Sequence, residues 1–397
     1  MNLKVKVLYL VSFAAFLRSF AQVIYVPSLA VMRTDLNVTA AVLGITISIY
    51  GLCLAFAQIA YGPIVDRFDS KRILLIGLSL YLLGSLSAYF TRGIGLLLVA
   101  RSMQALGIAA AAGVGIALIT DLFPTNERGR AMGIFSMFNS AGAASGPAFG
   151  GLIAVWLTWR ADFLILAILT IFLLAFTTWQ LPAQPVHGQK VGLMDMWTIA
   201  STVPTFGALI LGFVSFYGIY TIHTLTPILL TDKMSLHEAG IGAVSTMTAL
   251  GVIFGTYFGG RVSDQRGMRF TLIIGVIGST LSLAVITFIS SVASMDMSPV
   301  VVGAGLLAFG LTAGFGFAAQ LNIMVDYFPV MRGTAGALQF FARFIGTTLA
   351  PVIAGLLADR VGVPSGFGLA TGILALGAVI AYFTISNPVH VVEVVTE

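Results

Sequence analysis

Long apolar runs recur along the whole chain, and each can cross a lipid bilayer as one helix. A membrane helix needs about 20 apolar residues, whereas membrane barrel strands are about half as long and alternate in polarity. Only 9% of the residues are charged, against about a quarter in a soluble domain. We therefore predict an all-α membrane protein with twelve transmembrane helices. The expected spans are 6–31, 41–65, 73–91, 95–121, 130–156, 161–181, 203–230, 238–262, 270–292, 298–325, 332–357 and 366–386.

Lysine and arginine are distributed unevenly between the two sets of connecting loops. If the N-terminus is cytoplasmic, 12 of the 20 basic residues lie inside, 5 lie outside and 3 lie within spans. Cytoplasmic loops carry the excess of positive charge, so both termini are expected in the cytoplasm and the protein in the cytoplasmic (inner) cell membrane. Lys4 and Lys6 precede the first run as in a secretory signal, but no convincing cleavage site follows them, so this run is expected to remain as a span.

The two halves of the chain repeat each other at an offset near 200 residues. The paired segments are DLFPTNERGRAMGIF (121–135) with DYFPVMRGTAGALQF (326–340), GPIVDRFDSKR (62–72) with GGRVSDQRGMR (259–269), and SGPAFGGLIA (145–154) with LAPVIAGLLA (349–358). One duplication explains all three pairs. We expect two pseudo-symmetric six-helix bundles, 1–181 and 201–397 (the latter with a short cytoplasmic tail), joined by a cytoplasmic loop at 182–200. Paired halves of this kind enclose a central site and rock around it.

Three motifs stand in the first half. In GPIVDRFDSKR, Gly62 permits close helix contact and the carboxylate of Asp66 suits a helix N-terminus. In LLLVARSMQALGIAAAAG (96–113), Arg101 and Gln104 lie one turn apart on one face of the fourth span. In NSAGAASGPAFGGLI (139–153), glycines remove side chains so that helices can approach closely, and Pro147 bends the fifth span.

Together these motifs resemble the major facilitator superfamily, and within it the twelve-span drug:proton antiporter branch of bicyclomycin and chloramphenicol exporters. The resemblance covers nearly the whole chain, although the C-terminal half matches mainly in hydropathy and symmetry. It implies a monomer that exports drugs by alternating access, and so confers drug resistance through efflux. Asp69 stands where the family pattern has glycine, which puts the shape of that loop in doubt.

The resemblance implies gating roles for residues of the motif loop, of the helix ends and of the glycine seam. In the family, the loop that carries Asp66 and Arg67 latches the halves together and breaks as they rock. The gating or motif candidates are Gly62, Asp66, Arg67, Arg72, Asp121, Arg128, Asp264, Asp326, Arg332, Gly146, Pro147, Gly150 and Gly151. Asp121 and Asp326 occupy symmetric positions, where gating ion pairs or helix caps are expected.

Three arginines fall inside predicted spans, where a charge is expensive and indicates a site. The fifteen acidic residues lie in loops, tails or span ends, so the arginines are expected to lack resident counter-ions. An anionic or zwitterionic solute supplies that charge, since guanidinium groups bind carboxylate well. Alternatively, the arginines bind carbonyls, waters or acids such as Asp35. The substrate-binding candidates are Arg18, Gln22, Tyr25, Arg101, Gln104, Asn139, Tyr217, Tyr220, His223, Gln320, Asn322, Gln339 and Arg343.

These observations favour a secondary-active exporter of a small amphipathic organic compound, with proton antiport as the expected coupling. An organic-anion uptake or exchange porter without proton coupling is the alternative. The sequence shows no metal-ligand cluster, no phosphate-binding loop and only one cysteine, Cys53, so no enzyme activity, cofactor or metal is expected. Nothing in it suggests nucleic acid. The expected partners are the solute, protons and the lipid bilayer.

Overall fold

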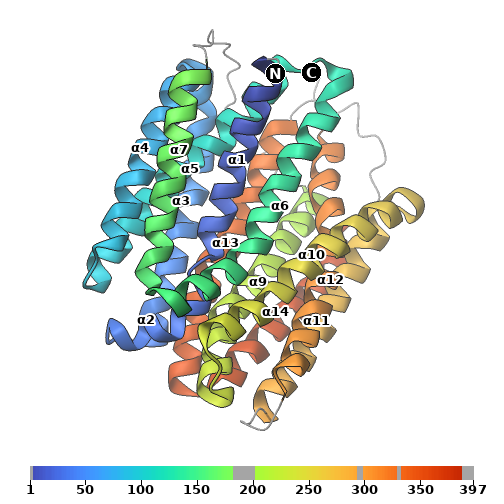
Figure 1. Ribbon diagram of the computed structural model, residues 1–397. Helices are drawn as coiled ribbons and strands as arrows, with labels where there is room; N and C mark the ends of the chain where they lie inside the picture. The colour runs from blue at the N-terminus through green and yellow to red at the C-terminus, as the bar shows by residue number, and fades with distance from the viewer. Residues whose placement is uncertain (1–2, 182–201, 293–297, 329–331, 387–397) are drawn as a thin grey trace. The chain divides into compact units, whose positions relative to one another are not determined.

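The computed structural model describes residues 3–181, 202–292, 298–328 and 332–386, and these ranges are helical almost throughout (Figure 1). The first half contains α1 (Leu3–Val23), the 3₁₀ turn η1 (Val26–Ser28), α2 (Leu29–Asp35), α3 (Ala40–Arg67), α4 (Ser70–Tyr89), α5 (Ile94–Leu122), α6 (Thr125–Trp156) and α7 (Trp159–Gln180). The second half contains α9 (Val203–Met234), α10 (Glu238–Arg266), α11 (Met268–Val292), α12 (Pro299–Tyr327), α13 (Arg332–Arg360) and α14 (Val363–Thr384).

Eleven described helical segments are long and apolar enough to cross a membrane, with residues 4–35 counted as one segment. The predicted fifth span corresponds to α6, which is not among these eleven because it is rich in glycine and polar residues. Its 32 residues extend about 48 Å, more than the hydrocarbon core requires. The predicted all-α membrane fold is confirmed.

Contacts divide the chain into two compact units. The first unit comprises Met1–Lys190 with Ser235–Thr246, and the second comprises Val191–Met234 with Met247–Glu397. The start of α10 therefore groups with the first unit, because its Gly242 packs against Gly151 of α6. The predicted linker at 182–200 lies outside the described residues.

A glycine seam joins α1 and α6 in the first unit. Gly142, Gly146 and Gly150 follow one another at intervals of four residues and therefore share one face of α6. A methyl group added at any of them would collide with α1 or with the residue that follows it, at the backbone of Phe16 for Gly142 and of Ile24 for Gly150. The motif glycines thus bring the two backbones together. Elsewhere in the first unit, α5 packs against α1, α3 and α4, and α7 packs against α4 (Figure 1).

The second unit repeats this plan. Helix α9 packs on α13 as α1 packs on α6, and α11 packs on α12 and α14 as α4 packs on α5 and α7. A methyl group added at Gly346 of α13 would meet the backbone of Phe213 on α9, just as one added at Gly142 would meet that of Phe16. The duplication read from the sequence is therefore visible as equivalent helix contacts.

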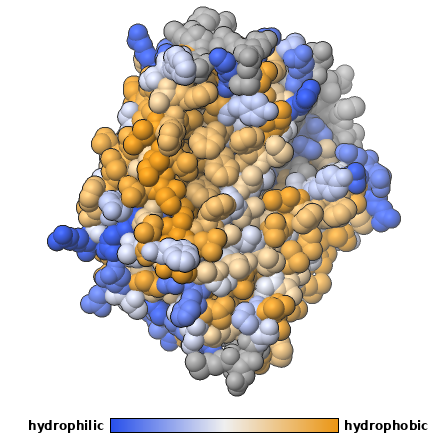
Figure 2. Space-filling view, viewed as in Figure 1, coloured by the Kyte–Doolittle hydropathy of each residue, from blue (hydrophilic) through white to orange (hydrophobic). Residues whose placement is uncertain are grey.

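The outer helix faces are apolar, as a lipid-facing surface requires. Figure 2 shows apolar residues along the middle of the visible helices and hydrophilic residues gathered toward their ends. Exposed large apolar side chains on the first unit include Ile76, Leu83 and Phe172, whose exposed fractions are 71%, 55% and 67%. Bilayer contact explains this exposure, which would be unfavourable in water.

The first predicted span is interrupted, which corrects the expectation of one continuous helix over 6–31. Helix α1 ends at Val23, and the chain passes through η1 before α2 begins. Pro27 causes the break because it lacks an amide hydrogen and its ring obstructs the preceding turn. The predicted single stripe of Arg18, Gln22 and Tyr25 is therefore split, and its members meet different helices.

Candidate functional site

Arg101 of α5 is enclosed in the first unit, and its hydrogen-bond partners among the described residues are neutral. Its side chain is 1% exposed, and its Nη1 donates to Gln104 Oε1 at 2.8 Å and to the Ala21 carbonyl at 3.4 Å. Its Nη2 donates to Tyr25 Oη at 3.4 Å, and its Cζ lies 4.6 Å and 4.1 Å from the ring centres of Tyr25 and Tyr50. Arg101 thus lies beside α1. Its contacts match the alternative of an arginine that binds the carbonyl of an irregular neighbouring helix.

We expect Arg101 to be important mainly for stability. Arg101→Ala removes the ring contacts and leaves Gln104 Oε1 without its donor, a loss of about 3 kcal/mol in the free energy of unfolding. Thermal unfolding of the purified protein in detergent measures this loss. Arg92→Ala is the control, because Arg92 is exposed and surface substitutions change stability by about 0.5 kcal/mol or less. Equal stability of the two variants would contradict this role.

Arg18 of α1 reaches across the glycine seam to α6. Its Nη2 donates to Asn139 Oδ1 at 2.8 Å, and Ser19 Oγ donates to the same oxygen at 2.6 Å. The Arg18 side chain is only partly buried, unlike that of Arg101. The structure thus joins two of the predicted site residues, Arg18 and Asn139, in one polar group at the α1–α6 contact.

Arg343 of α13 is the centre of the polar group in the second unit. Its Nη2 donates to Gln320 Oε1 at 3.1 Å, and Gln320 Nε2 donates to Ser215 Oγ at 2.9 Å. Its Cζ lies 5.2 Å and 5.3 Å from the ring centres of Phe216 and Phe317. The Arg343 side chain is 6% exposed, and no carboxylate of the described residues lies within ion-pair distance of it.

The two polar groups are reversed copies of each other. When α1 is aligned with α9 so that Phe16 matches Phe213, Arg18 matches Ser215. When α6 is aligned with α13 so that Gly142 matches Gly346, Asn139 matches Arg343. The first unit therefore carries its guanidinium on the first helix of the contact, and the second unit carries it on the other helix.

Other predicted binding residues lie around these groups. Gln339 is buried, and its Nε2 donates to the Ala208 carbonyl at 3.2 Å. Tyr220 of α9 is buried and its ring lies edge-on to His223, whose Nδ1 has no hydrogen-bond partner among the described residues. Tyr217 is buried, the Gln22 side chain is partly buried, and Asn322 is exposed near the end of α12.

The structure describes the side chains of some of the predicted gating residues. Asp69 begins α4, where its Oδ1 accepts from the Lys71 amide at 3.3 Å with a negative φ of −57°, so it acts as a helix cap without strain. Arg72, Asp264 and Asp326 are exposed at helix ends. The side chains of the remaining charged and loop candidates lie outside the described set: Gly62, Asp66, Arg67, Asp121, Arg128 and Arg332.

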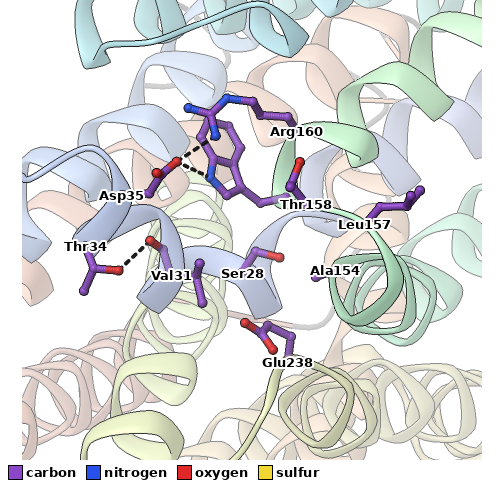
Figure 3. A pocket seen from close by; sticks show the side chains of 10 residues that line it. Ser28, Val31, Thr34, Asp35, Ala154, Leu157, Thr158, Arg160 and Glu238 are labelled. Carbon is purple, nitrogen blue, oxygen red and sulfur yellow. Dashed lines mark hydrogen bonds and ion pairs between the residues drawn. The ribbon is translucent and has the colours of Figure 1, made fainter.

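A pocket of about 440 Å³ lies in the first unit near the α6–α7 turn (Figure 3). Asp35, at the end of α2, accepts from Trp159 Nε1 at 2.9 Å and from Arg160 Nη1 at 2.7 Å. Arg160 Nε also donates to the Thr91 carbonyl at 3.0 Å, so this cluster ties α2, the end of α4 and α7 together. Glu238 also lines the pocket. Asp35 thus forms its ion pair with Arg160 and not with an arginine inside the predicted spans.

Asp162 lies at a span end, as the sequence predicts, but its side chain is buried. It stands in the first turn of α7, and its side chain is 0% exposed. Neither carboxyl oxygen has a hydrogen-bond partner among the described residues. A position near a helix end predicts exposure only when no neighbour covers it, and here the packing of α7 into the bundle covers it.

Two helical units of one plan, each with an arginine among amide and aromatic groups, define a multi-pass membrane transporter. The chain belongs to the Major Facilitator Superfamily, whose model matches residues 11–235 and 208–396. It is therefore a secondary transporter of a small-molecule solute, and no enzyme.

Known relatives agree with this assignment. Multidrug resistance protein D of Escherichia coli (strain K12) is 26% identical over 341 residues, 85% of each chain. Chloramphenicol resistance protein of Pseudomonas aeruginosa is 25% identical over 345 residues, 84% of this chain and 77% of the relative. The predicted resemblance to the drug:proton antiporter branch is confirmed. A bacterial homologue of the human lysosomal transporter Spinster, solved in an inward-facing, unoccupied conformation, has the same fold, with a TM-score of 0.80 at 16% identity and coverage of 97% of both chains.

Proposed function

We propose that this protein exports a small amphipathic organic compound, anionic or zwitterionic in preference, by alternating access in exchange for protons. Relatives named for resistance to several drugs and to chloramphenicol support the direction of export. The excess of basic residues in one set of loops supports cytoplasmic termini and a place in the cell membrane. We further propose that the protein works as a monomer and that the charged residues of the motif loops gate it.

We infer the preferred charge of the solute from the surroundings of Arg343. Its partners are the amide oxygen of Gln320 and aromatic rings, all of them neutral. An arginine stays protonated even when buried, so a solute carboxylate that reaches it gains a charge-assisted hydrogen bond. A lipophilic cation gains nothing there and is repelled.

Transport by the protein in sealed proteoliposomes tests both parts of the proposal. The solutes are salicylate as the anion, norfloxacin as the zwitterion, chloramphenicol as the neutral compound and methyl viologen as the cation. Flux of the anion or zwitterion that rises when a pH gradient is imposed supports proton-coupled export. Equal flux without the gradient identifies an exchange porter or uniporter, and flux of methyl viologen alone refutes the preference for negative charge.

A stability screen with the same compounds gives an independent measure of binding. A ligand that binds only the folded protein raises its unfolding temperature by mass action, whether or not it is transported. Salicylate or norfloxacin is expected to raise the unfolding midpoint more than methyl viologen does.

A further inference from the structure

Asp162 is a buried acid that takes no part in the polar groups described above. Its neighbours on the same face of α7 are Trp159, three residues earlier and 3% exposed, and Leu166, four residues later and fully buried. The Phe163 ring beside it packs at 5.7 Å from the ring centre of Tyr25. The residues around Asp162 on this part of α7 are therefore buried and aromatic or aliphatic.

The described charged groups near this part of α7 bind partners other than Asp162. Arg101 of α5 comes within 6.0 Å of the Phe163 ring centre, but its donors bind Gln104, Tyr25 and the Ala21 carbonyl. Helix α7 packs against α4, α1 and α6. On α4, Tyr81 is buried, and its Oη has no hydrogen-bond partner among the described residues. On α1, Arg18 donates to Asn139 of α6. On α7 itself, Arg160 binds Asp35. No described charged group forms an ion pair or hydrogen bond with the Asp162 carboxyl group.

An ionised carboxylate in such a place costs several kcal/mol, because it loses its hydration without gaining donors. The amides at the start of α7 offset only about 1 kcal/mol of this cost. A neutral carboxyl group costs far less. Ionisable residues inside membrane proteins are expensive and mark proton or solute pathways.

We propose that Asp162 is a proton-binding residue of this transporter. It carries a proton in the conformation described here, and its O–H bond breaks to release that proton when another conformation wets the carboxyl group. This inference rests on the proposed proton antiport and assigns the coupling to a residue of the first unit. The pocket at Asp35 lies close by, since its lining includes Trp159, one helical turn before Asp162.

Infrared difference spectroscopy of the purified protein tests the proposal without any solute. Wild type is expected to show the carbonyl stretch of a protonated carboxyl group, sensitive to hydrogen–deuterium exchange, and Asp162→Asn to lose it. Glu127→Gln is the matched control, since Glu127 also lies in the first turn of a long helix but is exposed. Persistence of the band in Asp162→Asn overturns the proposal. Should that variant fail to fold, Asp162→Glu must shift the band, and an unshifted band overturns the proposal equally.

Proteoliposome transport of salicylate and norfloxacin tests the coupling. Asp162→Asn is expected to lose the flux driven by the pH gradient at least tenfold, and to keep solute exchange without a gradient within about twofold of wild type. Retention of gradient-driven flux overturns the coupling role. If wild type itself does not respond to the gradient, proton antiport is refuted, and the infrared band alone then decides whether Asp162 binds a proton.

Discussion

Arg343→Gln is expected to reduce transport of an anionic solute tenfold to a hundredfold. The substitution keeps a polar side chain but removes the one full positive charge of its polar group, which Gln320 and Ser215 cannot replace. Loss of a charge-assisted hydrogen bond costs about 1.5–3 kcal/mol, and each 1.4 kcal/mol corresponds to a factor of ten. Initial rates of salicylate flux in proteoliposomes measure the effect.

Arg360→Gln is the control, because Arg360 ends the same helix α13 and is exposed. It removes the same charge without touching the polar group, so its flux should match wild type. Thermal unfolding of both variants separates a loss of transport from a loss of folded protein. Undiminished salicylate flux in a folded Arg343→Gln variant would remove the preference for an anionic solute and leave the transporter fold untouched.

Gly150→Ala is expected to produce the largest loss of stability. The added methyl group would overlap the carbonyl oxygen of Ile24, the residue after α1, and a buried backbone carbonyl cannot move aside as a flexible side chain can. Helices α1 and α6 must separate, at a cost of about 3 kcal/mol or more, which lowers the unfolding midpoint by about 5 °C or more. Thermal unfolding in detergent gives the midpoint.

Gly133→Ala provides a matched comparison in the same helix. Nothing lies within 4 Å of a methyl group there, and alanine is a better helix former than glycine by up to about 1 kcal/mol. Its unfolding midpoint should equal or exceed that of wild type. A Gly150→Ala midpoint as high as that of Gly133→Ala would show that the seam adjusts without cost.

The helices could be predicted from the sequence because bilayer thickness and hydropathy act locally. Each predicted span after the first corresponds to one helix, as 366–386 does to α14 (Val363–Thr384). The break after Val23 was missed, although Pro27 is a visible signal for it, because the apolar run continues past the proline.

The site could be predicted only in part. Arg18 and Asn139 were both candidates, and they do meet, because the contact follows from the glycine seam between their helices. The enclosure of Arg101 by Tyr50 was missed, since a tyrosine of another helix carries no sequence signal that marks its contact.

The sequence by itself determined the membrane class, the order of the helices, the internal duplication and the family, because each of these depends on composition and spacing along the chain. Only the tertiary structure decided which polar groups meet across helices. Helix packing rotates each side chain toward or away from its neighbours, and this rotation encloses Arg101, surrounds Arg343 with aromatic rings and buries Asp162 at a span end.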